Sequence, residues 1–202
     1  MALKCLVKIS SVNNLSDARY AAGMGVELMG FDLNPDSEHF VSPEQFNAIT
    51  SWVSGVKFVG EFDHYDAAYI DEVLAQYPLD YVQVTHLVEQ SNLFNCPRPV
   101  IIKIDHADKM SIKEVFEKFY PHPPWFLMEP QQEMSDDLLK WCIQMASQYP
   151  IILGSNLTVD NIDHLVDAGF SGFALRGGNE IRPGFKNFDE LADILEALEI
   201  ND

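Results

Sequence analysis

Eight short apolar runs recur along the chain at intervals of roughly 20 to 28 residues. Most are continuous rather than alternating, which is typical of parallel strands that are covered on both faces. We therefore expect eight buried strands. The runs are Leu6–Ile9, Leu28–Phe31, Val56–Val59, Tyr81–Val84, Val100–Ile104, Trp125–Met128, Ile151–Leu153 and Phe173–Leu175.

Helical patterns occupy most of the segments between these runs, with apolar residues three and four positions apart. The expected order is a strand followed by a helix, eight times. Thr158 is a predicted N-cap, whereas the segments 105–113 and 121–124 are predicted loops. The helical patterns cover Asp17–Gly25, Pro43–Trp52, Asp66–Gln76, Ile112–Phe119, Asp136–Ser147, Thr158–Gly169 and Leu191–Leu198.

Two closures of such a chain compete, a (βα)8 TIM barrel and an open doubly wound sheet. Eight units in 202 residues fit the compact end of the barrel range. No Gly-x-Gly-x-x-Gly motif follows the first strand, which disfavours a dinucleotide-binding sheet. No linker or low-complexity segment divides the chain. We therefore predict an α/β fold in which residues 1–202 form one TIM-barrel domain.

The charge of the chain restricts its partners. Its formal net charge is −18, and its 13 lysines and arginines are spread without a cluster, so we expect it to bind neither nucleic acid nor an anionic membrane. No apolar stretch is long enough for a membrane span, and no signal-peptide pattern is present. Three cysteines without metal-like spacing indicate reduced thiols and a cytoplasmic location.

Candidate chemistry gathers at predicted strand ends. Lys8 and Ser10 share one face of the first strand, and a lysine inside a barrel needs a partner or a ligand. Lys103 and Asp105 share a face at the end of the fifth strand, where an ion pair is favoured over an acid–base pair. Three histidines (His64, His86 and His106) lie near strand exits, but their spacing does not demand a metal, and we expect none.

Several segments resemble phosphoribosylanthranilate isomerase, in order along nearly the whole chain. The likeness is weakest between about residues 86 and 125. The matching segments are Lys8-Ile9-Ser10-Ser11-Val12-Asn13, Asp17-Ala18, Ala22-Gly23-Met24-Gly25, Gly30-Phe31, the stretch 37–45, Asp80-Tyr81-Val82-Gln83-Val84, Gly154-Ser155-Asn156-Leu157-Thr158-Val159-Asp160-Asn161, Gly178-Asn179-Glu180 and Pro183-Gly184-Phe185-Lys186.

This resemblance implies a TIM barrel that catalyses an Amadori rearrangement in tryptophan biosynthesis. An acid protonates the furanose oxygen, and a base removes the C2 proton of the sugar. The two groups need different protonation states at one pH, so they sit in different environments. No cofactor is implied.

The chain departs from the family pattern at the residues that carry this chemistry. The cysteine that serves as base is replaced by Ser10, and a free hydroxyl is a poor base. Glu129 stands where the family has the aspartate that serves as acid. His39 aligns with the arginine credited with binding the anthranilate carboxylate, and Thr85 replaces a histidine. The last strand carries Ala174 and Arg176 in place of an aspartate and a serine.

The resemblance also implies a set of binding residues for a phosphorylated small molecule. The expected substrate-binding residues are Lys8, His39, Gln83 and Asp105. The expected phosphate-binding residues are Gly154, Ser155, Asn156, Arg176, Gly177 and Gly178, although Arg176 is about as well explained by a salt bridge with an acid.

The sequence leaves two main functions open, besides a third, a different reaction on the same phosphate-binding scaffold. One is isomerase activity, with Glu129 as acid and Ser10 or Asp105 as base. The other is binding of a phosphorylated metabolite or a protein partner without the parent reaction. A monomer and a homodimer are both compatible with the chain, and we expect exposed Phe116, Phe119 and Trp125 to leave room for a dimer.

Overall fold

A computed structural model describes residues 2–64, 66–86, 91, 95–176, 180–182, 185–186 and 189–200. The strands are β1 (Leu6–Ser10), β2 (Leu28–Asp32), β3 (Lys57–Glu61), β4 (Tyr81–Thr85), β5 (Val100–Ile104), β6 (Phe126–Met128), β7 (Ile151–Leu153), β8 (Gly172–Arg176), β9 (Glu180–Arg182) and β10 (Phe185–Lys186). The helices are α1 (Leu15–Gly23), α2 (Pro43–Thr50), α3 (Ala67–Gln76), α5 (Lys109–Phe119), α6 (Asp136–Ala146), α7 (Val159–Asp167) and α8 (Asp189–Ala197).

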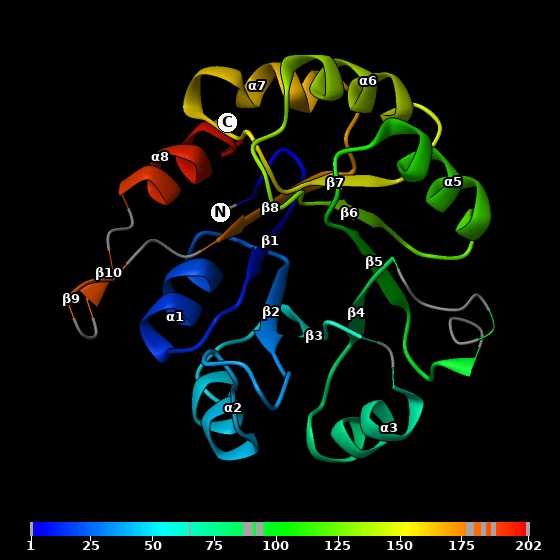
Figure 1. The fold of residues 1–202 in the computed structure, drawn as a ribbon. Coiled ribbons are helices and arrows are strands. Elements are labelled where there is room, and N and C mark those ends of the chain that lie inside the picture. The colour runs from blue at the N-terminus through cyan, green and yellow to red at the C-terminus, as the bar shows by residue number, and fades with distance from the viewer. Residues whose placement is uncertain are drawn as a thin grey trace.

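The first eight strands form a closed parallel barrel. Lys8 of β1 lies opposite Leu28 of β2 on one side and Ala174 of β8 on the other, which closes the ring. The helices surround the strands (Figure 1). The predicted TIM barrel is therefore confirmed, and the open doubly wound sheet is excluded. The helix expected after the fourth strand was predicted without bounds, and residues 87–90 and 92–94 of that segment lie outside the described residues.

Side-chain caps determine where several helices begin. Ser42 accepts a hydrogen bond from the Gln45 amide at the start of α2. Asp108 accepts a hydrogen bond of 2.8 Å from the Ser111 amide, so α5 begins at Lys109. The loop predicted over 105–113 was therefore too long, because the cap at Asp108 starts the helix early. Thr158 is the N-cap of α7, as predicted.

The barrel interior changes from apolar to polar along its axis. Six buried side chains fill its centre: Leu28, Val59, Ile101, Leu127, Ile152 and Ala174. Strand side chains alternate between faces, so the residue two positions further along each of these strands also points inward. Those next residues are Gly30, Glu61, Lys103, Glu129, Gly154 and Arg176. The sequence thus places a polar layer directly above the apolar core.

Glycine is required where this polar layer is crowded. A Cβ atom at Gly30 would clash with the Glu61 carboxylate and would lie 2.8 Å from the Lys8 ammonium nitrogen. A Cβ atom at Gly154 would lie 3.2 Å from the Leu127 side chain. These two glycines therefore provide the space that neighbouring side chains fill.

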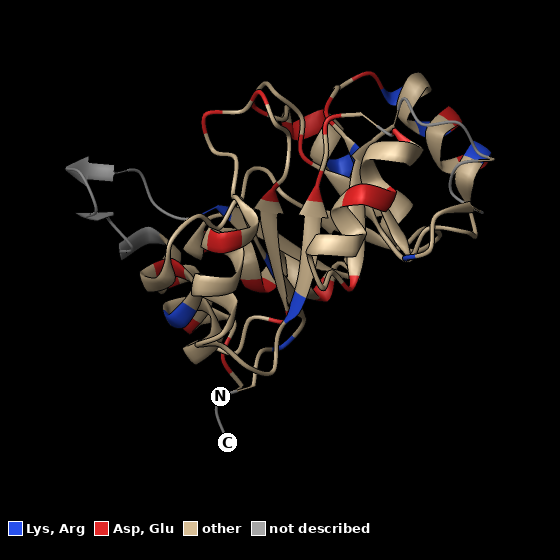
Figure 2. Cartoon of the chain, turned by 90° about the horizontal axis from the view of Figure 1, so that it is seen from below, with Lys and Arg blue, Asp and Glu red and all other residues tan. Residues whose placement is uncertain are grey.

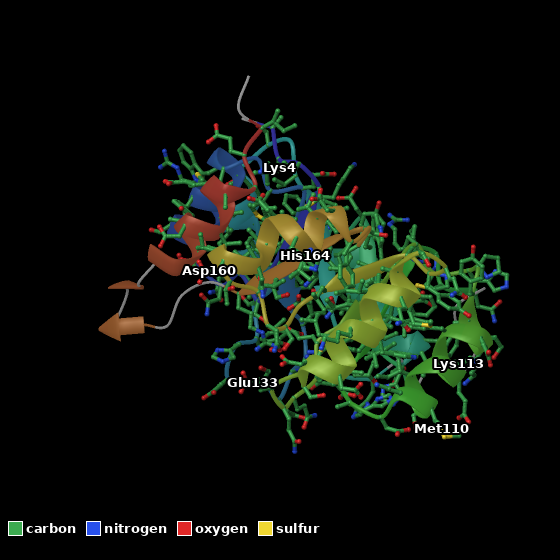
Figure 3. The ribbon with its side chains drawn as sticks, turned by 90° about the horizontal axis from the view of Figure 1, so that it is seen from above. Lys4, Met110, Lys113, Glu133, Asp160 and His164 are labelled. Atoms are coloured by element: carbon green, nitrogen blue, oxygen red, sulfur yellow. The ribbon has the colours of Figure 1, made fainter. Side chains whose placement is uncertain are left out.

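The aromatic side chains expected on the surface of α5 are part of the core. Phe116 and Phe119 are fully buried, and Phe116 packs against Phe126 with ring centroids 4.8 Å apart. Trp125 is partly buried beside the barrel core. The prediction that these residues leave room for a dimer was wrong for both phenylalanines, because α5 turns this face toward the barrel. Met110, which is 75% exposed, lies instead on the outer side of α5 (Figure 3).

Each helix in the described part of the chain is too short or too polar to cross a lipid bilayer.

Candidate active site

A polar cavity of about 160 Å³ opens at the C-terminal ends of the barrel strands. This is the end at which (βα)8 barrels carry their active sites. Figure 2 shows acidic positions at the strand arrowheads and in the loops beyond them. The structure brings Ser10 and Glu129 to this one cavity, as the sequence predicted for the two catalytic positions. Its wall also includes Asp32, His39, Glu61, Gln83, Lys103 and Arg176.

Lys8 is fully buried and does not itself line this cavity, but it contacts two residues that do, Ser10 and Glu61. Its ammonium group forms an ion pair with the Glu61 carboxylate and donates a 2.7 Å hydrogen bond to the Ser10 hydroxyl. The second oxygen of Glu61 accepts hydrogen bonds from the amide and the hydroxyl of Ser11, at 3.0 and 3.1 Å. The partner that the sequence required for Lys8 is therefore Glu61.

Glu129 is held between two cations on the opposite side of the cavity. One carboxylate oxygen lies 2.7 Å from the Lys103 nitrogen, and the other accepts a 2.9 Å hydrogen bond from Arg176. Burial by itself raises the pKa of this carboxyl, but the hydrogen bond from Arg176 and the charges of both cations outweigh it. They lower the pKa of Glu129 to about 2, so the side chain is ionised near neutral pH.

The fifth strand departs from the arrangement that alternation predicted. Lys103 pairs with Glu129 rather than with Asp105, so the predicted Lys103–Asp105 ion pair was wrong. Asp105 lies one residue beyond the end of β5 at Ile104, where strand pairing no longer fixes the direction of a side chain. Asp105 does not line the mouth cavity; its carboxylate faces His86 and His106. The structure therefore separates Asp105 from the other predicted substrate-binding residues.

The remaining predicted substrate-binding residues lie on the cavity wall. Gln83 is 95% buried, and its side-chain oxygen has no hydrogen-bond partner in the described part of the chain. Such an orphaned acceptor is costly unless a ligand or water satisfies it. His39 lies in the loop after β2, where its side chain is 58% exposed and its Nε2 atom is 3.6 Å from the Glu38 carboxylate.

The comparisons with known proteins agree with this architecture. A family model described as N-(5'phosphoribosyl)anthranilate (PRA) isomerase matches residues 7–197. The chain belongs to this family. The PRA isomerase of Nitrosomonas europaea is 33% identical over 206 residues, an alignment that covers 97% of this chain and 96% of the relative. That of Nitrosomonas eutropha is 25% identical over 203 residues and covers 97% of both chains.

Solved PRA isomerases share the fold. The structure from Thermotoga maritima matches with a TM-score of 0.80 at 21% identity, covering 96% of this chain and 98% of that one. A PRA isomerase in complex with reduced 1-(O-carboxyphenylamino)-1-deoxyribulose 5-phosphate matches with a TM-score of 0.80 at 20% identity and the same coverage. At this identity the likeness concerns the barrel itself.

Ser10 and Glu129, the residues that the sequence predicted to transfer protons, are not in a state to do so in this structure. Among the described residues, none accepts a hydrogen bond from the Ser10 hydroxyl, which itself accepts one from Lys8. No described neighbour therefore activates the Ser10 hydroxyl as a base. Glu129 keeps the carboxyl of the acid position, but its two cations hold it in the charged form. Both groups need a change of partner before they can move a proton.

In the loop after β7, which was expected to bind phosphate, the side chains are already hydrogen-bonded to neighbouring residues. Asn156 accepts a 3.0 Å hydrogen bond from the Met134 amide and donates one of 2.8 Å to the Met134 carbonyl. Ser155 donates its hydroxyl hydrogen to Asn156. These side chains join the loops after β6 and β7, which leaves backbone amides as the groups for an anion. Gly177 and Gly178 lie outside the described residues.

Arg176 was expected to bind phosphate, with a salt bridge to an acid as the alternative. The structure shows the salt bridge, to Glu129, whereas the guanidinium side chain is still 62% exposed. Glu61 is a cavity residue that the sequence analysis missed. The apolar run was taken to end at Val59, although β3 continues to Glu61. The same alternation that placed Lys8 inside the barrel places Glu61 there, two positions after Val59.

Proposed function

We propose that this chain catalyses the isomerisation of N-(5'-phosphoribosyl)anthranilate in tryptophan biosynthesis, with a phosphorylated small molecule as its substrate. The observation that carries the proposal is the family match over residues 7–197, which runs from β1 to α8. The departures from the family pattern change which residues carry the chemistry, but two carboxylates, Glu129 and Glu61, remain at one cavity. The binding-only alternative has no observation in its favour.

The acid step requires the Glu129 carboxyl to be protonated, whereas in the free protein it is ionised. Arg176 is largely exposed and follows directly after the barrel core on β8, beside the loop expected to hold phosphate. A phosphate dianion competes with Glu129 for this guanidinium. Once Arg176 turns to phosphate, the burial of Glu129 and the loss of one cation raise its pKa. Substrate binding itself thus prepares the acid that protonates the furanose oxygen.

The base step falls to Glu61 in preference to Ser10. A carboxylate is a stronger base than a hydroxyl that lacks an activating partner. Glu61 lines the cavity, and Lys8 and Ser11 contact both of its oxygens, so it takes the substrate proton by giving up one of these contacts. Ser10 positions the Lys8 ammonium group through the 2.7 Å hydrogen bond. The acid then stands directly after β6 and the base at the end of β3, and their roles differ because the exposed Arg176 contacts Glu129, whereas buried Lys8 contacts Glu61.

The remaining groups bind the substrate. We assign the phosphate to the backbone amides of the loop after β7 together with Arg176, because this is where barrels commonly hold phosphate. Gln83 offers its orphaned carbonyl to a sugar hydroxyl. His39 stands at the cavity rim for the anthranilate carboxylate. Asp105 has no role in this assignment.

A tryptophan auxotroph that lacks the isomerase provides the test. We expect the wild-type gene to restore growth without tryptophan, and the Glu129→Ala variant to fail. Glu133→Ala is the matched control, because Glu133 is an exposed carboxylate on the loop after β6 (Figure 3). Failure of well-folded wild-type protein to support growth would contradict the proposal and favour a binding function.

We also infer a cytoplasmic location and a monomeric or homodimeric state. No disulfide bond is present among the described residues, as expected in a reducing compartment. A net charge of −18 disfavours binding to nucleic acid. One solved relative, from Thermotoga maritima, is described as dimeric, with monomers obtained from it. Sedimentation of the purified chain distinguishes the two states.

A further inference from the structure

Two histidines and one aspartate meet beside the barrel mouth. His86 follows β4, whereas Asp105 and His106 follow β5, and each offers one ligand atom within 4.8 Å of the other two. Asp105 Oδ1 lies 3.4 Å from His86 Nδ1 and 3.9 Å from His106 Nδ1. One carboxylate oxygen therefore faces a ring nitrogen of each histidine.

Three of the four ring nitrogens in this cluster lack hydrogen-bond partners among the described residues. His86 Nδ1 and both ring nitrogens of His106 are inaccessible to solvent and make no hydrogen bond within the described residues. Buried polar atoms in native proteins are usually satisfied, and those that are not point to an ion or water at the site. One ion bound between the two rings and Asp105 would satisfy one orphaned nitrogen of each histidine. The two nitrogens of the His106 ring point in different directions, so a single ion takes only one of them.

The spacing suits a tetrahedral ion. Zinc bound at about 2.0–2.2 Å by imidazole nitrogen and carboxylate oxygen places neighbouring ligand atoms about 3.4 Å apart. The distance of 3.4 Å between Asp105 and His86 matches this value, whereas the distance of 3.9 Å between Asp105 and His106 is longer. All three ligand atoms lie within 4.8 Å of one another, so an ion must draw them closer together. The two histidine rings are not parallel; their planes are inclined by 58°.

The backbone around the cluster is anchored. The His86 amide donates a 2.8 Å hydrogen bond to the Lys103 carbonyl of β5, and the Gln131 amide donates one of 3.0 Å to the Asp105 carbonyl. The Gln131 side chain lies 3.5 Å from Asp105 Oδ2, the oxygen that does not face the histidines. Such outer contacts hold ligands in place.

The charge around the cluster favours a cation. A cavity of about 540 Å³ is lined by both histidines, and it also exposes Asp108, Glu114 and Lys118. With Asp105, three carboxylates stand against one lysine, in a chain whose net charge is −18. Imidazole nitrogen with carboxylate oxygen is a ligand set for first-row transition ions, whereas magnesium and calcium prefer oxygen alone.

We propose that His86, Asp105 and His106 bind one divalent transition-metal ion of the zinc type, with a fourth position open to water or a small ligand. The site is separate from the proton-transfer groups assigned above, and it does not depend on the isomerase reaction. It revises the sequence-based expectation of no metal. That expectation rested on spacing along the chain, which does not reveal that the ends of β4 and β5 bring these residues together.

Calorimetric titration of the metal-free, tag-free chain with zinc tests the proposal. We expect one zinc ion per chain. The His86→Ala and His106→Ala variants should each lower the affinity by at least about 100-fold, since even loss of a supporting contact costs 10- to 100-fold. His64→Ala and Cys96→Ser are the controls, because they remove other potential zinc ligands outside the cluster; both should retain wild-type binding.

A measurement on the wild-type chain guards against variants that do not fold. Long-range proton–nitrogen NMR spectra show which imidazole nitrogens bind zinc. We expect His86 and His106 to shift with one equivalent of zinc, while His64 stays unchanged. No zinc binding by the wild type, equal binding by the folded histidine variants, or shifts only at other histidines would each overturn the proposal.

Discussion

The charge state of Glu129 is the central question at the scale of single residues. Its carboxylate is mostly buried between Lys103 and Arg176, which lower its pKa to about 2. For an acid with that pKa, the deprotonated form exceeds the protonated form by roughly five orders of magnitude at pH 7. Catalysis by this group therefore needs a change in its partners, and Arg176 is the one that is exposed enough to leave.

Replacing Arg176 with alanine tests this exchange. The hydrogen bond and charge that lower the pKa of Glu129 are removed, so the carboxyl protonates at a higher pH in the free protein. The limb of the kcat/KM profile along which activity falls with rising pH should move to higher pH, and KM should rise through lost phosphate binding. Carbon-13 NMR titration of Glu129 measures the pKa directly.

The control for this variant is Arg19→Ala, which removes a cation from the exposed surface of α1. It should leave both the pKa of Glu129 and KM unchanged. An unchanged Glu129 pKa in Arg176→Ala would contradict the account of the acid.

Exchange of the two candidate bases separates Glu61 from Ser10. Glu61→Gln removes the carboxylate and should lower kcat by about 10²- to 10⁴-fold, the usual contribution of a positioned base. Ser10→Ala removes only a hydrogen bond to Lys8 and should cost far less. Steady-state kinetics on variants whose circular dichroism matches the wild type provide the measurement. The opposite order of effects would return the base to Ser10.

At the scale of elements, two glycines differ in the space around them, one in a strand and one in a helix. Gly172 begins β8, where a Cβ atom would meet the Leu6 backbone of the neighbouring strand β1 and lie 2.9 Å from the Leu6 side chain. Gly23 ends α1, where a Cβ atom would meet nothing within 4 Å. The same substitution therefore has opposite consequences in the two elements.

Gly172→Ala should destabilise the protein by about 1–3 kcal/mol, because the strands that close the barrel cannot move apart freely. Gly23→Ala should stabilise it by about 0.5–1 kcal/mol, because alanine loses less conformational freedom in a helix. Urea unfolding monitored by circular dichroism gives both values. Equal effects in the two variants would show that the closure between β1 and β8 is looser than described.

The element pattern also shows where sequence reasoning succeeds. The strands could be predicted because each is a short apolar run, and the identity of the inward faces followed from alternation. The errors arose at strand ends. β3 runs two residues beyond its apolar run and carries Glu61 into the barrel, whereas β5 stops at Ile104 and releases Asp105. Strand ends are fixed by pairing with neighbours, which a single sequence does not display.

At the scale of the whole molecule, closure of the ring determines which distant residues meet. Lys8 and Glu61 are 53 positions apart and pair because β1, β2 and β3 are neighbours in register. Glu129 and Arg176, 47 positions apart, meet across β6, β7 and β8. The family resemblance pointed to the acid position, but neither the partners of Glu129 nor the His86–Asp105–His106 cluster could be predicted without the closed barrel.

Turnover of N-(5'-phosphoribosyl)anthranilate by the purified chain tests the central claim most directly. The account predicts measurable conversion by the wild type, lowered about 10²- to 10⁴-fold by Glu129→Ala and unchanged by Glu133→Ala. A folded wild-type chain that gives no conversion above the uncatalysed rate, or conversion that is indifferent to Glu129, would contradict it.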